Sequence, residues 1–531
     1  MIASNPNLNS SGIAVNYCRT TPKLFWIIFV VFAVFSGIAD ITHFRNLPEQ
    51  LIGRSDQANT ANVARNIVEG KGATTDAIWL LTNGGIPGNA IPQPESYWSV
   101  YLAYVVAISF SLFGAGLKSL LIPAVIAKTA IATLATLATL KIGKSLLAAS
   151  ACGAFLLFHP LMTSRLNGQN DIYLTLCIIA ALMLLISGIL SDSWLKFLAF
   201  GLCTGIAIGI KPSGGLLIGL PVAYLLFSGP IQKSAPKIGL AIIGITIGIM
   251  PLIFHNETYF GTVTGPGFGL VGEAARISYL TGDHNKGFFD PEPFPTALNE
   301  QKAASPKQSQ SVSNINQFVV NLANGELIPS WQMPFIFLVI TSTMINLRSL
   351  RFLGQKNFES QFIYQTILLT FGGVLLGFAV HFEARYWNFL VPLFSIITAV
   401  AMARMSKYLL WFMIGITAFA FVLDQRYYKA VEVPAGFVKA ESLLPSDAVV
   451  LTPEPWEFAF HTHLKAVVLP YTDKPNVVEG ISKRYRADYL VIVNKNIRHE
   501  FYRPIINGHF PSYLVPVFQD DSLIVAKFNW K

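Results

Sequence analysis

Residues 171–190 read DIYLTLCIIAALMLLISGIL, and apart from Asp171 at the start this stretch carries no charged side chain. A helix of about 20 apolar residues is long enough to cross the hydrocarbon core of a bilayer. Similar runs recur along the chain, whose 531 residues are 53% hydrophobic but only 13% charged. Soluble domains carry about 25% charged residues. The sequence therefore predicts a polytopic α-helical membrane protein and excludes a soluble enzyme, a disordered chain and a fibrous repeat.

The apolar runs define the expected organisation of the chain. They lie near 24–39, 98–113, 119–140, 146–163, 171–190, 195–210, 213–228, 238–254, 332–347, 362–380, 386–403 and 408–423. Two long polar stretches, about 40–96 and about 255–330, interrupt them, and from about Asp424 the composition is that of a soluble domain. We therefore expect a transmembrane core over residues 1–425 and a small α/β domain over residues 426–531.

The distribution of Lys and Arg orients this core. Basic residues gather in short loops such as 233–237, 348–356 and 404–407. Such loops stay in the cytoplasm, which accounts for the net charge of +9 without nucleic-acid binding. Alternation from these loops places the amino terminus inside, and both long polar stretches and the carboxy-terminal domain outside. The chain is expected in the inner (plasma) membrane, surrounded by its lipids.

The run at 98–113 decides the number of spans. An inside amino terminus and an outside carboxy terminus require an odd number of crossings. The run is short, and it opens with Tyr97, Trp98, Tyr101 and Tyr104, whose polar edges favour the membrane interface. We predict an interfacial helix here and eleven true spans, with twelve or thirteen as the alternative counts.

The carboxy-terminal domain shows alternating strand and helix signals. The expected strands are Val449–Thr452, Ala466–Leu469 and Tyr489–Val493, followed by a hairpin of Leu514–Phe518 and Leu523–Phe528. Helix-like stretches around Pro455–Thr462 and Val477–Tyr485 separate the strands. This alternation favours a partly parallel sheet with helices packed on it.

Acidic residues near the expected outer surface are candidates for chemistry, because an uncompensated charge is costly there. Asp56 precedes an amphipathic run, Ala58–Gly70, which is expected to lie on the membrane. Asp171 opens a span at its outer mouth. Either aspartate also fits the simpler role of a helix cap. Both are carried forward as catalytic candidates.

Basic residues at the same level are candidates for binding phosphate. Lys211 precedes Pro212 at a helix break, and breaks of this kind expose backbone groups that serve ligand sites. Arg385 lies in a short turn between two spans, where a guanidinium could hold two phosphate oxygens. The simpler alternatives are a lysine reaching out to the interface and a surface pair between Arg385 and Glu383.

Other residues offer weaker signals. His255 begins the long outer stretch and is better explained as a surface histidine than as a metal ligand. The cysteines lie before, within or beside apolar runs, so neither a structural disulfide nor a cysteine-based metal site is expected. The chain has no P-loop, no dinucleotide-binding glycine pattern and no Gly-x-Ser-x-Gly elbow.

Taken in order, the short motifs resemble those of the GT-C glycosyltransferases, in particular bacterial relatives of the protein O-mannosyltransferases and the lipid A aminoarabinose transferases. The matching residues are Ser55-Asp56-Gln57-Ala58, Ala64–Gly72, Pro92–Trp98, Leu112-Phe113-Gly114, Asn170-Asp171-Ile172, Gly205-Ile206-Ala207 with Lys211-Pro212, Arg385-Tyr386 with Leu390-Val391-Pro392, Leu444–Val450 and Ala487–Leu490. The resemblance implies transfer of a hexosyl or pentosyl group from a polyprenyl-phosphate sugar to a lipid, glycan or protein acceptor outside the membrane.

The resemblance also implies roles for single residues. Asp56 would accept the proton of the acceptor, and Asp171 would be a supporting acid near the acceptor or the donor. Lys211 and Arg385 would hold the donor phosphate, with His255, Glu383 and Tyr386 as supporting residues. No cofactor is expected, although a divalent metal is not excluded by the sequence.

The chain departs from the family in two places. Many members have two adjacent acids where this chain reads Asp56-Gln57. Many also have Lys-Pro-Pro or His-Pro-Pro where this chain has Gln93-Pro94-Glu95, so the usual cation is absent there. Arg65 and Lys71 are the substitutes that the first outer loop offers. The alternatives to a transferase are a non-catalytic protein that binds sugar lipids and a transporter or flippase for them.

Overall fold

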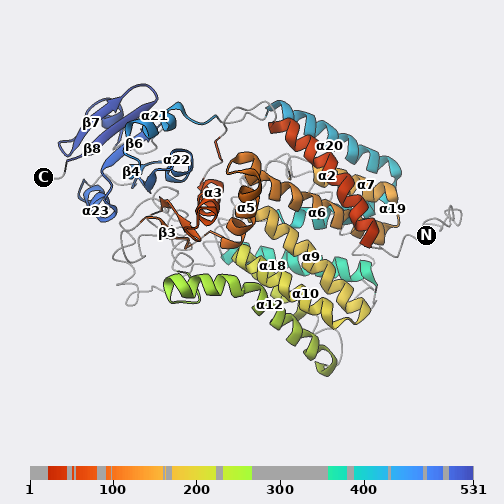
Figure 1. Ribbon diagram of the computed structural model, residues 1–531. Helices are drawn as coiled ribbons and strands as arrows, with labels where there is room; N and C mark the ends of the chain where they lie inside the picture. Colours follow the sequence, from red (N-terminus) through yellow and green to blue (C-terminus); the bar gives the residue numbers. More distant parts are fainter. Residues whose placement is uncertain are drawn as a thin grey trace, which may run out of the picture.

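A computed structural model describes residues 22–44, 51–52, 55–79, 91–96, 98–158, 162, 170–222, 231–265, 357–379, 388–427, 432–470, 475–493 and 502–529. Its helices form a bundle at one end of the molecule, and a sheet with short helices forms the other end (Figure 1). The first described helix belongs to the bundle, and the last strands belong to the sheet. The structure thus has a helical part and a part with a mixed sheet.

The bundle is built from apolar helices. They are α2 (Pro22–Phe44), α6 (Leu117–Gly143), α7 (Leu146–Phe158), α9 (Asn170–Ser191), α10 (Trp194–Ile210), α12 (Ile231–Phe260), α18 (Phe358–Ala379), α19 (Leu390–Met405) and α20 (Lys407–Tyr427). Within the described part of the chain, Leu117–Gly143, Asn170–Ser191 and Ser234–Phe260 are long and apolar enough to cross a membrane. The predicted class, a helical membrane protein, is confirmed. The count of eleven spans stays a prediction, and the run at 332–347 lies outside the described residues.

Helices α10 and α12 approach each other closely through glycines. A Cβ added to Gly201 would lie 2.0 Å from the carbonyl oxygen of Ala241, and one added to Gly205 would lie 2.3 Å from that of Ile245. On the opposite helix, Gly244 and Gly248 face α10 in the same way. Glycines spaced four residues apart let helix backbones pack directly inside a membrane. This contact fixes the end of α10 at which Lys211 lies.

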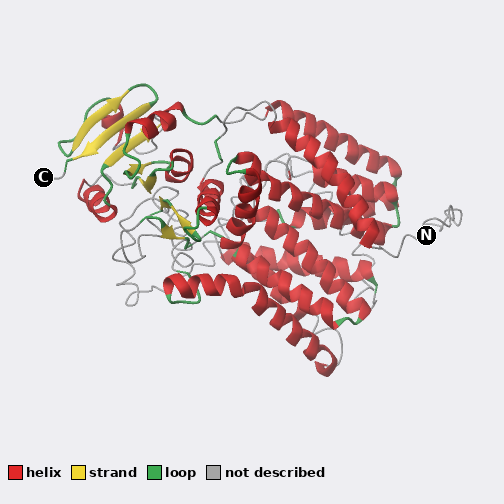
Figure 2. Cartoon of the chain, viewed as in Figure 1, coloured by secondary structure: helices red, strands yellow, loops and turns green. Residues whose placement is uncertain are grey.

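The run predicted to be interfacial forms the helix α5 (Val100–Phe113), and the side chain of Ser99 caps its first turn. Fourteen residues give a helix of about 21 Å, which is shorter than the hydrocarbon core of about 30 Å. The helix lies at the end of the bundle nearest the sheet (Figure 2). Its place at the membrane interface stays a prediction.

The carboxy-terminal part is a six-stranded mixed sheet with the order β2-β5-β4-β6-β8-β7. The strands predicted from the sequence are found as β4 (Val449–Thr452), β5 (Lys465–Val468), β6 (Tyr489–Val493), β7 (Leu514–Gln519) and β8 (Leu523–Phe528). Strands β5, β4 and β6 are parallel, whereas β8 and β7 form the antiparallel hairpin. The helices α22 (Pro455–Thr462) and α23 (Pro475–Tyr485) were also predicted, whereas α21 (Ala435–Leu443) and α24 (Arg503–Ile506) were not.

The remaining strand of this sheet comes from the first polar stretch. Strand β2 (Ala77–Ile78) pairs in parallel with β5, so that Ala77 lies opposite Ala466. A second small sheet, of β1 (Thr74–Thr75) and β3 (Gln93–Pro94), lies in the same stretch. The polar stretch and the carboxy-terminal domain therefore share one hydrogen-bonded sheet. Charge alternation placed these two segments on the same side of the membrane.

Candidate active site

Asp56 lies in the first turn of α3 (Ser55–Val68). Its Oδ1 accepts a hydrogen bond of 3.0 Å from Nε1 of Trp98, and the side chain is half-buried. The positive end of a helix dipole favours a carboxylate in this turn. The sequence led us to expect this amphipathic run on the membrane surface. The structure corrects this, because ten consecutive residues of α3, from Gln57 to Asn66, are buried between protein elements.

The hydrogen-bond partner of Asp56, Trp98, belongs to a cluster of three tryptophans. The ring of Trp98 lies 5.2 Å from that of Trp79 and 5.9 Å from that of Trp456, and all three side chains are buried. They come from the first polar stretch, the residues just before α5 and the carboxy-terminal domain. Their apolar rings lower the local dielectric constant, which strengthens the hydrogen bond from Trp98 to Asp56.

Glu95 is a buried carboxylate in the segment Gln93-Pro94-Glu95, where the resemblance led us to expect a cation. Its Oε2 accepts a hydrogen bond of 2.5 Å from Asn59, and its Oε1 accepts one of 2.8 Å from the backbone N–H of Trp98. Asn59 lies on the same helix as Asp56, and it also accepts a hydrogen bond from Thr75. Glu95 therefore ties the helix that carries Asp56 to the residue that binds Asp56. No local sequence signal distinguishes this glutamate from a solvated one.

Asp171 and Lys211 form an ion pair at the bundle end of the site. The Lys211 Nζ lies 2.6 Å from Oδ1 of Asp171, whose side chain is only 6% exposed, whereas that of Lys211 is 22% exposed. Asp171 is in the first turn of α9, and Lys211 follows the last residue of α10. The structure thus brings two of the predicted site residues together. Asp171 holds the ammonium group of Lys211 in place.

The start of α5 connects this ion pair with Asp56. Trp98 donates its hydrogen bond to Asp56, and the hydroxyl of the next residue, Ser99, donates one of 3.1 Å to the carbonyl oxygen of Gly209. Gly209 lies two residues before Lys211 and is covered by the ring of Tyr101. Asp56 and Lys211 are therefore attached to the same short segment of chain, on the same end of the bundle.

Arg65 was predicted to contact a donor phosphate, but the structure surrounds it with other partners. Its guanidinium lies 3.2 Å from the carboxylate of Asp76 and donates to the carbonyl oxygens of Ala459 and Phe460. The side chain is buried, and Nη1 also lies 3.1 Å from Nδ1 of His463. These contacts fasten the carboxy-terminal domain to α3.

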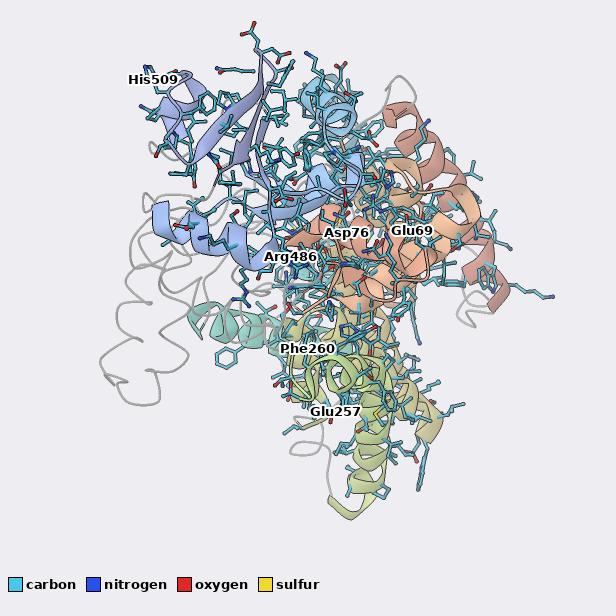
Figure 3. The ribbon with its side chains drawn as sticks, turned by 60° about the vertical axis from the view of Figure 1, so that its left-hand side comes forward. Glu69, Asp76, Glu257, Phe260, Arg486 and His509 are labelled. Carbon is cyan, nitrogen blue, oxygen red and sulfur yellow. The ribbon has the colours of Figure 1, made fainter. Side chains whose placement is uncertain are left out.

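The other predicted residues differ in their surroundings. Lys71 is exposed and forms an ion pair of 2.7 Å with Glu69, and Glu69 lies near Asp76 (Figure 3). Lys71 and Arg65 hold the pKa of Glu69 below its usual value, although burial opposes this shift. His255 was expected at the surface, which is wrong. It is buried, with Nε2 2.7 Å from the carbonyl oxygen of Glu95.

Arg385, Glu383 and Tyr386 lie outside the described residues, so their roles stay predictions. Among the residues that the structure describes, no three His, Cys, Asp or Glu side chains gather in a group that could hold a metal ion.

Comparison with known proteins finds one family model that is similar to part of the chain. A family model described as dolichyl-phosphate-mannose-protein mannosyltransferase matches residues 99–255, a segment that contains Asp171 and Lys211. No curated protein sequence matches the chain.

Solved structures share the fold. The oligosaccharyltransferase of Archaeoglobus fulgidus superposes with a TM-score of 0.57 when bound to zinc and sulfate, at 11% identity, over 88% of this chain and 68% of that one. Its apo form gives 0.56 at 12% identity, over 90% and 70%. ArnT from Cupriavidus metallidurans is also similar, with a TM-score of 0.47 and 16% identity over 94% and 97% of the two chains. The chain is thus similar to the dolichyl-phosphate-mannose-protein mannosyltransferase family over residues 99–255, and it shares the fold of an oligosaccharyltransferase of known structure.

Proposed function

We propose that the chain transfers a hexosyl or pentosyl group from a polyprenyl-phosphate sugar to an acceptor at the extracytoplasmic face of the membrane, with Asp56 as the base. The observation that carries this proposal is the placement of a hydrogen-bonded carboxylate, Asp56, and a cation, Lys211, on either side of one short segment, Trp98–Ser99. Sugar transfer from a lipid phosphate needs these two kinds of group, one for the acceptor and one for the leaving phosphate.

The proposed reaction is a single displacement at the anomeric carbon. An acceptor oxygen or nitrogen forms the new bond to this carbon while the bond to the phosphate oxygen breaks. The proton of the acceptor passes to Asp56, and the electron pair of the broken bond leaves with the polyprenyl phosphate. Attack from the face opposite the leaving group inverts the configuration at the anomeric carbon.

The surroundings of Asp56 suit a base. The hydrogen bond from Trp98 fixes the direction of its carboxylate, and the indole rings of Trp79 and Trp456 pack against Trp98 and hold it in place. A catalytic group held in one geometry avoids the cost of being oriented at the moment of reaction. Asp56 therefore needs little rearrangement to meet an acceptor.

Lys211 suits the leaving phosphate. An ammonium group carries three N–H donors, so the contact with Asp171 is compatible with a contact to a phosphate oxygen. Asp171 then acts by orienting Lys211 rather than by meeting the acceptor. We keep Arg385 and Lys71 as further candidates for the phosphate, whereas Arg65 is excluded from this proposal because its partners are Asp76 and two backbone carbonyl groups.

The test uses the full chain in its own host. Mass spectrometry of envelope glycans and lipids, compared between cells with and without the chain, identifies the sugar and the acceptor. Asp56→Asn keeps the size of the side chain and its acceptor oxygen for Trp98 but loses most of its basicity. We expect this variant to accumulate normally and to lose the modification. A normal rate of modification by Asp56→Asn would remove Asp56 from the role of base.

A further inference from the structure

The helix α22 of the carboxy-terminal domain lies against the start of α3, where Asp56 is found. The carboxylate Oε1 of Glu457 accepts a hydrogen bond of 3.0 Å from the backbone N–H of Ser55. Glu457 is buried, and Ser55 directly precedes Asp56. The hydrogen bond therefore fixes the backbone at the residue next to the proposed base.

Two further contacts come from the neighbouring residue, Trp456. Its carbonyl oxygen accepts a hydrogen bond of 2.7 Å from the side chain of Asn62, two turns along α3 from Asp56. Its ring packs edge to face against that of Trp98, the residue that donates to Asp56. The same short helix thus supports the backbone before Asp56, the body of α3 and the hydrogen-bond partner of Asp56.

We propose that the carboxy-terminal domain is part of the catalytic site, because Glu457 and Trp456 position the carboxylate of Asp56. Glu457 is a positioning residue here, since it acts through Ser55 and not on substrate. The inference rests on the proposed role of Asp56 as the base. It adds that the soluble domain is required for the chemical step itself, whatever acceptor the enzyme uses.

The physical reason lies at the amino terminus of α3. The first N–H groups of a helix have no partner within the helix, and a buried one that loses its acceptor is destabilised. Without Glu457, the first turn of α3 can shift until the N–H of Ser55 meets another acceptor, and Asp56 shifts with it. A displacement of about 1 Å at a catalytic group can cost about a hundredfold in rate.

The experiment measures the initial rate of the envelope modification by the full chain, with one pair of variants at Glu457. Glu457→Gln keeps the length of the side chain and an acceptor oxygen for Ser55 but removes the charge. Glu457→Asp keeps the charge but is one methylene too short to reach the Ser55 N–H. We expect the rate to fall about tenfold or more for Asp and to change by less than about threefold for Gln.

Matched controls separate positioning from folding. Glu479→Ala removes an exposed glutamate of α23 in the same domain, which pairs with Lys483, and it should leave the rate unchanged. Thermal unfolding of each purified variant in detergent reports the fold directly. Glu457→Ala is a more drastic change. If this variant fails to accumulate, the rates of Glu457→Gln and Glu457→Asp still test the inference.

The double variant Glu457→Asp with Asp56→Asn tests whether Glu457 acts through Asp56. If it does, adding Glu457→Asp to Asp56→Asn causes no further loss of rate. Long incubations make the low residual rate of Asp56→Asn measurable. A loss that multiplies in the double variant, or a normal rate for Glu457→Asp alone, overturns the inference and leaves the role of Asp56 standing. Full activity of Asp56→Asn instead overturns the proposed function itself.

Discussion

The indole N–H of Trp98 donates to the carboxylate of Asp56 over 3.0 Å, across 42 positions of sequence. Trp98 lies two residues before α5, and Asp56 lies in the first turn of α3, in the first polar stretch. Their contact joins the two elements that lie between the membrane bundle and the carboxy-terminal sheet. It also sets the direction in which the proposed base faces.

Two substitutions in the tryptophan cluster should differ sharply in their effect on the rate of transfer. Trp98→Phe keeps an aromatic ring but removes the hydrogen bond to Asp56, so we expect transfer to fall about tenfold. Trp456→Phe removes an N–H that is buried and has no hydrogen-bond partner among the described residues, so it should cost little. Initial rates of the envelope modification compare the two variants. Equal losses would show that the cluster acts only by packing.

The Asp171–Lys211 pair should separate stability from activity. Lys211→Met leaves the buried carboxylate of Asp171 without its cation, which we expect to lower both thermal stability and transfer. Replacing both, as Lys211→Met with Asp171→Leu, should restore much of the unfolding temperature but not the transfer. Thermal unfolding in detergent and the modification rate test the two effects. Recovered transfer in the double variant would exclude Lys211 from phosphate binding.

The attachment of the carboxy-terminal domain should weaken in acid. Burial, with help from Arg65 and His463, lowers the pKa of His461 from 6.5 to about 4, and its Nε2 accepts a hydrogen bond from the N–H of Ile52. Because the unfolded state then binds the proton more readily, the stability from His461 is complete above about pH 6.5 and is lost toward pH 4.

Melting temperature measured across this pH range tests the prediction. His461→Gln, which cannot gain a proton but can still accept from Ile52, should show a shallower fall. An equally steep fall in this variant would assign the acid sensitivity to other groups, of which His463, with its lowered pKa, is the nearest.

Larger side chains at Gly205 should disrupt the core of the bundle. A Cβ there would lie 2.3 Å from the carbonyl oxygen of Ile245, so Gly205→Leu forces α10 and α12 apart. We expect less folded protein in the membrane and a lower unfolding temperature. Gly239→Leu is the control, because a Cβ at Gly239 on α12 meets nothing within 4 Å. Similar stability of the two variants would contradict the close packing of the helices.

Arg385 carries a prediction from the sequence alone. A guanidinium in the turn expected at 381–386 is always charged and can hold two phosphate oxygens in a planar fork, which a lysine cannot reproduce. Transfer should fall when Arg385 becomes Lys and fall further when it becomes Ala. A contribution of about 3 kcal/mol to the transition state corresponds to a loss of roughly a hundredfold. Normal transfer by well-expressed Arg385→Ala protein would show that this arginine contributes to membrane topology and not to catalysis.

The sequence alone determined the long apolar helices of the described residues and the strands β4 to β8. The apolar run that begins near Asp171 is α9, and the strand predicted at Tyr489–Val493 is β6 with the same bounds. Helix and strand signals are local, because they depend on the hydrophobicity and periodicity of neighbouring residues. The candidates Asp56, Asp171 and Lys211 could be named for a related reason, since a charge at the end of an apolar run is conspicuous.

Only the tertiary structure decided how these elements work together. The two-residue strand β2 has no periodic signal, and it joins the sheet by pairing with β5, almost 400 positions away in the chain. The roles of Glu95, Glu457 and Arg65 depend in the same way on distant partners. In the sequence each reads as an ordinary charge, and each is buried here only because a distant segment supplies the hydrogen bonds that offset its loss of water.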